Sequence, residues 1–298
     1  MDTSVKADTA WQSGRFDATS GPQRLLFGEM YEDAEIEVSA FRGKRRIFCI
    51  ASAGSTAWRL AAEHDVVACD INPTQLAYAE RRVKGGRHEL GDAERAMRFV
   101  GSFMALVGWR RELVATFLSL SDPHEQPMFW HTHLDTRRFR AGFDLLLSRV
   151  LLRAIYAPRF LAILPSHFGR VVRRRFERGF ARHANSTNPY PRMLFLGEGS
   201  TGPYIPPKTI EFVLADAAAY LESCPMRSFD GFALSNILDG AESSYAARLF
   251  NAVRHAAAPD AVVVLRSFAE PASLSDSNRA ECDRSMLWGI VDVRSAHL

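Results

Sequence analysis

The chain has 298 residues, a formal net charge of +3 and 47% hydrophobic residues, a composition typical of a folded protein with a substantial buried core. No apolar run is long enough to span a membrane, and the polar N-terminus lacks the apolar stretch of a signal peptide. The four cysteines do not follow a metal-binding spacing, so we expect a reduced, cytoplasmic protein.

The charge is distributed unevenly. Residues 137–182 contain twelve arginines, no lysine and only two acids, Asp144 and Glu177. Three explanations stay open: peripheral contact with an anionic membrane, binding of an acceptor carboxylate through Arg137 or Arg138, or solvated helix faces in an arginine-rich protein. No recognition motif accompanies these arginines, so we do not expect a nucleic-acid partner.

The first half of the chain begins with a polar arm and an amphipathic pattern that predicts a helix over residues 21–41, within an N-terminal segment of residues 1–45. Residues 46–90 predict strands at 47–52 and 66–71 with a helix between them. A further helix is predicted from Pro73 to Val83, ahead of the stop signal Gly85-Gly86.

Residues 91–190 show only helical patterns, at 92–107, 109–119, 134–157 and 166–183, and are predicted to form an insertion that binds the acceptor or acts as a lid. In residues 191–298 the alternation returns. Strands are predicted at 210–216, 229–236, 261–268 and 288–294, and helices at 217–223 and 242–257. The sequence therefore predicts an α/β fold with a doubly wound sheet and one large helical insertion.

The clearest candidate binding site follows the first two strands. Ser52, Ala53, Gly54 and Ser55 are small, so the backbone can approach a ligand closely and present N–H groups at the start of the helix. Asp70 ends the second strand, where a carboxylate can accept hydrogen bonds from both ribose hydroxyls. The dinucleotide motif G-x-G-x-x-G is absent, which favours a smaller adenosine-containing ligand.

Two further strand ends carry polar residues. Asp216 ends the third strand and is followed by Ala217, a pair suited to an adenine amino group; Asp92 is the rival, although we expect it to cap the helix that starts there. Ser235 and Asn236 end the fourth strand, where the reacting end of a ligand should lie.

A hydroxyl acceptor would benefit from a general base, and His131, His133 and Asp135 cluster in the stretch WHTHLDTRRF. A structural role is the alternative. No cysteine or second histidine pair accompanies this H-x-H pattern at ligand spacing, so we expect no metal site.

Several stretches resemble a known family: FGEMYED (27–33), IASAGSTA (50–57), DINPTQ (70–75), LSN (234–236), HLDTRRFR (133–140) and NSTNPY (185–190). They are similar to the S-adenosylmethionine (SAM)-dependent 3-amino-3-carboxypropyl transferases related to the first enzyme of betaine-lipid synthesis, over about residues 20–270. The Asp-x-Asn-Pro-x-Gln element is the most specific of these stretches.

The resemblance implies a class I SAM-methyltransferase-like sheet that uses SAM as co-substrate and releases methylthioadenosine. Tyr31, His133 and Asn236 are then the candidate catalytic residues, with Tyr31 facing the sulfonium, and Glu32 or Asp33 would hold the SAM ammonium. The residues expected to bind SAM are Phe27, Tyr31, Glu32, Ser52, Ala53, Gly54, Ser55, Asp70, Ile71, Gln75, Asp216, Ala217, Ser235 and Asn236.

The chain is shorter than the lipid enzymes, so the resemblance favours a small hydroxylated or phenolic acceptor, such as the phenol of a nocardicin-like antibiotic intermediate (an isonocardicin synthase-like activity). Transfer to diacylglycerol at a membrane, closure of SAM to azetidine-2-carboxylate, ordinary methyl transfer and a non-catalytic SAM-binding module stay open. So does a homodimer.

Overall fold

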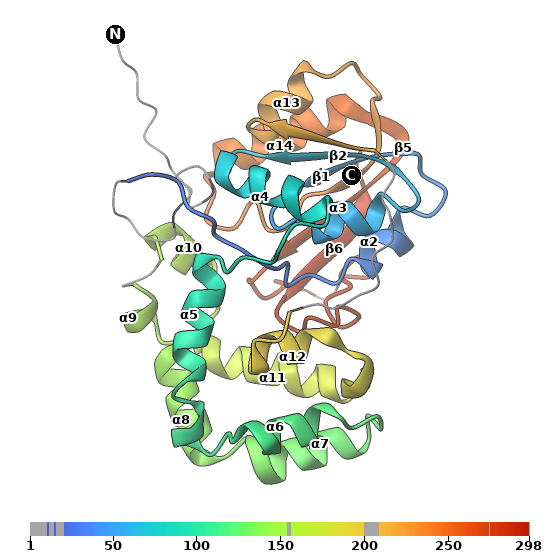
Figure 1. The fold of residues 1–298 in the computed structure, drawn as a ribbon. Coiled ribbons are helices and arrows are strands. Elements are labelled where there is room, and N and C mark those ends of the chain that lie inside the picture. The colour runs from blue at the N-terminus through green and yellow to red at the C-terminus, as the bar shows by residue number, and fades with distance from the viewer. Residues whose placement is uncertain are drawn as a thin grey trace.

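The computed structural model describes residues 11, 15, 21–153, 156–199, 209–273 and 275–297. Its centre is a six-stranded sheet in the order β3-β2-β1-β4-β5-β6, with helices on both faces (Figure 1). The first five strands are parallel and β6 is antiparallel to β5. The strands are β1 (Arg46–Ile50), β2 (Asp65–Asp70), β3 (Ile210–Leu214), β4 (Phe229–Ala233), β5 (Ala257–Ser267) and β6 (Ile290–Ser295). The α/β prediction is confirmed at this level.

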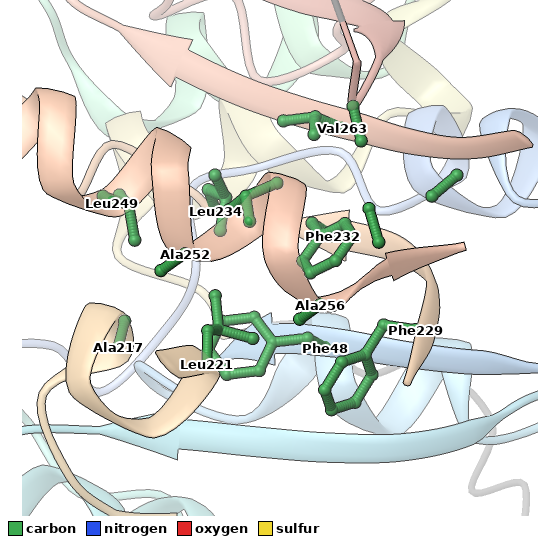
Figure 2. Packing of buried hydrophobic residues seen from close by; sticks show 14 of the residues in the cluster. Phe48, Ala217, Leu221, Phe229, Phe232, Leu234, Leu249, Ala252, Ala256 and Val263 are labelled. Carbon is green, nitrogen blue, oxygen red and sulfur yellow. The ribbon is translucent and has the colours of Figure 1, made fainter. Parts of the chain in front are cut away.

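Apolar side chains on both faces of the central strands hold the helices in place. Phe48 and Phe232 pack under α13 (Ala217–Ser223) and α14 (Ser243–Ala256), against Leu221, Leu249 and Ala252 (Figure 2). The opposite face is covered by α2 (Glu35–Ala40), α3 (Ser55–Leu60) and α4 (Pro73–Val83). Because the central strands are buried on both sides, they consist of nearly continuous apolar runs.

The helix predicted from Pro73 to Val83 is confirmed as α4. The Asn72 side chain caps it by accepting from the backbone N–H groups of Thr74 and Gln75, and Pro73 occupies its first position. The strand predicted at 229–236 ends earlier, at Ala233, because Ser235 adopts a left-handed conformation with φ 53° that a strand does not allow.

The helix predicted over residues 21–41 is wrong: the helix there is α2, Glu35–Ala40. Residues 22–33 instead form an irregular segment, here called the strap, that runs across the sheet domain. Its backbone donors are taken by distant side chains: Gln75 accepts from the N–H groups of Leu26 and Phe27, and Glu94 from that of Gly28. These tertiary hydrogen bonds replace the local ones of a helix.

The insertion is helical, as predicted, but its helices are shorter and more numerous. The predicted helix 134–157, for example, is divided at Ser148. The Ser148 side chain caps a new helix, Arg149–Leu152, by accepting from the Leu151 N–H. The elements are α5 (Asp92–Gly101), η1 (Met104–Val107), α6 (Arg111–Leu118), α7 (Glu125–Phe129), η2 (Trp130–Leu134), α8 (Arg137–Leu146), α9 (Arg149–Leu152), α10 (Pro158–Ile163), α11 (Phe168–Phe180), η3 (Asn185–Thr187) and α12 (Pro189–Leu196).

This helical region has a core of its own, beside the sheet domain (Figure 1). Trp109, Trp130 and Phe176 are buried in it, and Met286 enters it from the segment between β5 and β6. Among the described residues, no helix combines the length and the apolar character needed to cross a lipid bilayer.

Candidate functional site

A cavity of about 320 Å³ opens at the carboxyl ends of the parallel strands. It lies where the sheet order reverses between β1 and β4, the position at which open α/β sheets bind ligands. Residues that follow four strands line it together: Ser52, Asp70, Ile71, Asp216, Ala217, Ser235 and Asn236. All seven were predicted as site residues, from stretches up to 184 positions apart in the sequence.

Asp70 is fixed by the backbone around it. One carboxylate oxygen accepts from the Ser52 N–H (3.1 Å) and the other from the Asn72 N–H (2.9 Å). Burial raises the pKa of Asp70 to about 6, and these two hydrogen bonds oppose that shift. The carboxylate still borders the cavity, and each oxygen has a second lone pair for a ligand hydroxyl.

Asp216 lies at the end of the neighbouring β3. One oxygen caps α13 through the Ala219 N–H (2.9 Å), and the other accepts from the Tyr245 hydroxyl (2.8 Å). The Arg248 guanidinium is 3.6 Å away. Its rival Asp92 is not among the residues that line the cavity, and it does not cap α5: Gly91 is the N-cap and Asp92 the first helical residue.

Ser235 and Asn236 form the side of the cavity beyond β4. The Ser235 backbone carbonyl accepts from the Arg266 N–H of β5 (2.7 Å), which holds the left-handed turn in place. The Asn236 amide donates to Asp239 (3.3 Å), a carboxylate whose pKa is raised by burial.

Gln75, predicted as a SAM contact, lines the cavity and also holds the strap in place. Its amide is committed to backbone groups of Leu26, Phe27 and Ser52, at 2.8 to 3.1 Å. It thus clamps the strap to the loop after β1 and places Phe27 in the cavity wall. This long-range role leaves no pattern in the sequence.

The remaining small residues of the loop shape the turn without lining the cavity. Ala53 is buried against Met30 and Tyr78, and Gly54 has φ 87°, the left-handed conformation that glycine adopts without strain. Ser55 starts α3.

Glu32 and Asp33 belong to a buried ionic cluster that the sequence did not predict. Arg266, fully buried on β5, ion-pairs with Glu37 and with Asp283 (3.2 Å) and lies 3.6 Å from Glu32. Asp33 binds the Arg284 guanidinium through both oxygens, each at 2.6 Å, so it is not available for a SAM ammonium as expected. Glu32 instead accepts from the Ser235 hydroxyl, behind the cavity wall.

Tyr31 does not line this cavity, although it was predicted to face the sulfonium. Its hydroxyl donates to Glu94 (3.1 Å) and borders a second cavity of about 400 Å³ between the strap, α5, α6 and α12. Burial and the Glu94 charge raise the pKa of Tyr31 far above its usual value. The second cavity is walled mainly by apolar side chains, among them Met97, Met104 and Phe195.

The structure does not bring His133 to the first cavity either. It lies exposed on η2, with its ring 4.6 Å from that of Phe129, and η2 continues α7 at the far end of the helical region (Figure 1). Its neighbour His131 pairs with Glu177 (2.8 Å). Arg137 and Arg138 are exposed on α8 and are likewise absent from the cavity lining.

Sequence analysis missed the part of the lining that comes from α14 and the loop before it. Ile237, Glu242, Tyr245 and Arg248 all border the cavity, and Trp11 does so from the N-terminal segment. A polar face on the helix after the fourth strand was the available signal, but periodicity alone does not tell a ligand-facing side from a solvent-facing one.

The lining is suited to an adenosine-containing ligand. Two carboxylates that accept hydrogen bonds lie at adjacent strand ends, and Ile71, Ile237 and the Tyr245 ring offer apolar surface for a purine. No protein-family model matches the chain, and neither the curated proteins nor the solved structures contain a significant match.

Proposed function

We propose that this protein transfers the 3-amino-3-carboxypropyl group of SAM to a hydroxyl or phenol of a small-molecule acceptor and releases methylthioadenosine. The observation that carries the proposal is the convergence of Asp70 and Asp216 on one cavity, at the ends of two paired strands. The sheet would then be of the class I SAM-methyltransferase type.

In this proposal Asp70 accepts hydrogen bonds from the two ribose hydroxyls, and Asp216 faces the adenine amino group. The purine lies between the apolar side chains of Ile71 and Ile237. The methionine part of SAM then extends toward Ser52, Ser235 and Asn236, which border the same cavity on its β1 and β4 side.

The choice of reaction rests on the resemblance of Asp70–Gln75 and of the other family-like stretches. A sulfonium is already a good leaving group, so the work of the protein is to orient SAM. If the γ-carbon faces the acceptor, the aminocarboxypropyl group moves and methylthioadenosine leaves; if the methyl group faces it, the product is S-adenosylhomocysteine.

Identification of the nucleoside product tests the proposal. The protein is incubated with SAM and a panel of phenols and alcohols, and the products are separated and weighed by mass spectrometry. Methylthioadenosine with an acceptor that has gained the aminocarboxypropyl mass supports the proposal. S-adenosylhomocysteine would identify a methyltransferase, azetidine-2-carboxylate a cyclase, and bound but unconsumed SAM a binding module; each contradicts it.

A second candidate, the same transfer to a lipid at an anionic membrane, is favoured by an exposed apolar surface on the helical region. Phe99 on α5, Phe103 just before η1 and Leu106 on η1 are 50–74% exposed, and Leu145 and Val150 on α8 and α9 are 63–76% exposed. η1 packs against α8, and α8 packs against α9.

Exposed arginines lie on or next to the same elements: 95 and 98 on α5, 137 and 138 on α8, and 153 directly after α9. An apolar face with a basic margin is the pattern of an interfacial membrane contact. Flotation with vesicles of anionic or neutral lipid tests it. Binding to anionic vesicles that is lost when Phe99 and Leu106 are both changed to Ser supports the lipid candidate; no flotation contradicts it.

A further inference from the structure

Glu32 is a buried carboxylate, and the Ser235 hydroxyl lies between it and the first cavity. Its residue is 8% exposed, and the Ser235 hydroxyl donates a hydrogen bond to it. Ser235 itself lines the cavity on the side where the proposed function places the reacting carbon. A proton released there therefore has a short path to a buried carboxylate.

The backbone holds Ser235 in an unusual position. Its φ of 53° is in the left-handed region, which residues with a side chain rarely adopt. The hydrogen bond from the Arg266 N–H to the Ser235 carbonyl keeps the turn closed. Strained residues of this kind cluster at functional sites, where the conformation directs a side chain.

Three charged side chains from other segments of the chain surround Glu32. Arg266 of β5 lies 3.6 Å away, but Glu37 of α2 and Asp283 of the segment before β6 share that guanidinium. Tyr190 of α12 donates to the Glu32 backbone carbonyl (2.6 Å). Burial, opposed by Arg266 and reinforced by the other carboxylates, raises the pKa of Glu32 to about 7.

The other carboxylates in the cavity wall are committed elsewhere. Asp70 is assigned to the ribose, Asp216 accepts from Tyr245, and Glu242 ion-pairs with Arg159 (2.5 Å). His133, the base predicted from sequence, is outside the cavity.

We propose that Glu32 is the proton acceptor of the reaction and that it acts through the Ser235 hydroxyl. This inference rests on the proposed function and names the residues that activate its acceptor. Ser235 touches the acceptor, and Glu32 is the positioning residue behind it.

The step balances as follows. The acceptor oxygen gives its proton to the Ser235 oxygen as Ser235 passes its own proton to the Glu32 carboxylate. A lone pair of the acceptor oxygen forms the new bond to the γ-carbon of SAM, and the carbon–sulfur pair leaves with sulfur. The sulfonium and the carboxylate both become neutral, so the step removes one positive and one negative charge from the site.

The first arm of the test measures the pH dependence of methylthioadenosine formation from SAM, with p-cresol and N-acetyltyrosinamide as probe acceptors. The wild-type kcat is expected to rise through pH about 7, as Glu32 loses its proton. Glu32→Gln is expected to lower kcat about 100-fold and to remove this rise, with SAM affinity nearly unchanged.

Ser235→Ala and Ser235→Gly separate the hydroxyl from the backbone. Both lack the hydroxyl, but glycine relieves the left-handed strain, so Ser235→Gly is expected to fold at least as stably as Ser235→Ala. Both are expected to lose the rise in kcat. A Glu32→Gln or Ser235→Gly protein that keeps the wild-type pH profile overturns the inference.

The second arm does not depend on activity. Infrared difference spectra of wild-type and Glu32→Gln protein, recorded across the same pH range, are expected to show one carboxyl band that titrates near pH 7 and is missing in the variant. Absence of that band overturns the inference. If the band is present but wild-type protein makes no methylthioadenosine with any acceptor, the proposed function fails while Glu32 keeps its proton-binding property.

Discussion

Asp70 holds the loop after β1 through two backbone hydrogen bonds and borders the cavity at the same time. Its raised pKa follows from burial, because a carboxylate at the end of an inner strand has little water around it. Ligand binding and the charge of this single side chain are therefore linked.

Asp70→Asn is expected to weaken SAM binding about 10- to 100-fold, because an amide donates where a ribose hydroxyl needs an acceptor. In wild-type protein, affinity should also fall as pH drops below about 6, where Asp70 gains a proton. Titration calorimetry measures both effects. Asp65→Asn, at the exposed opposite end of β2, is the control and should bind normally; equal affinity of Asp70→Asn and wild type would contradict the assignment.

The raised pKa of Glu32 also predicts how the stability of the protein depends on pH. Its pKa is raised from 4.5 to about 7 in the folded protein, so the folded state binds this proton more tightly than the unfolded chain. The contribution of Glu32 to the free energy of unfolding therefore falls as pH rises from about 4.5 to about 7.

Glu32→Gln should consequently gain stability relative to wild type across this window, by on the order of 3 kcal/mol at its upper end. Urea unfolding at several pH values measures the difference. A difference that does not change with pH would show that Glu32 does not titrate in this range.

At the scale of elements, the strap shows how tertiary contacts override local preference. Residues 22–33 have helical periodicity, yet side chains of α4 and α5 hold them in an irregular path. Tyr78 and Arg82, one turn apart on α4, both donate to the Gly28 carbonyl at 2.7 Å, and Arg82 also ion-pairs with Glu29. The strap is therefore a fixed wall between the two cavities.

Gln75→Leu should release this wall, because it leaves the backbone groups of Leu26, Phe27 and Ser52 without their partner. We expect a loss of at least about 2 kcal/mol in the free energy of unfolding and weaker SAM binding. Thr74→Ala, exposed on the same helix turn, should change the unfolding free energy by less than about 0.5 kcal/mol. Equal unfolding midpoints for the two variants would contradict the role of Gln75.

For the whole molecule, the question is how the helical region is attached to the sheet. Arg175 of α11 is buried and donates to the carbonyls of Leu287 (2.5 Å) and Phe268 (3.0 Å), in the segment between β5 and β6, and it ion-pairs with Glu270. Met286 enters the aromatic core of the helical region from the same segment. The two parts are thus joined here by both polar and apolar contacts.

Arg175→Met should lower the free energy of unfolding by about 2–4 kcal/mol, because it leaves buried carbonyls unpaired. Arg174→Met removes the same charge at the exposed neighbouring position and should be nearly neutral. Guanidinium unfolding of both variants makes the comparison. Similar losses in both would mean that the charge of α11, and not the attachment, sets stability.

Part of the arginine excess of residues 137–182 is accounted for by ion pairs. Arg140, Arg173 and Arg182 form ion pairs with Asp135, Asp144 and Glu281. The Arg182–Glu281 pair is exposed and adds little to stability, whereas Arg173 and Asp135 are mostly buried. The exposed arginines on and next to α8 and α9 are the ones relevant to the lipid candidate.

The sequence by itself determined the parts that depend on local rules. The Asn72-Pro73 signal defined α4, continuous apolar runs defined β1 and β2, and parallel topology brought Asp70, Asp216 and Ser235 to one edge of the sheet. These features follow from capping, burial and the direction of neighbouring strands, each of which acts within a few residues or applies to every sheet of this type.

Only the tertiary structure decided the path of the strap, the turn of Tyr31 toward the second cavity, the exposure of His133 and the contact of Glu32 with Ser235. Glu32 and Ser235 are 203 positions apart, and Arg266 of β5 contacts both: its N–H donates to the Ser235 carbonyl, and its guanidinium lies 3.6 Å from Glu32. Such contacts form because a buried polar group needs a hydrogen-bond partner, and the fold supplies one from a distant part of the chain. The spacing of residues in the sequence does not indicate which partner that is.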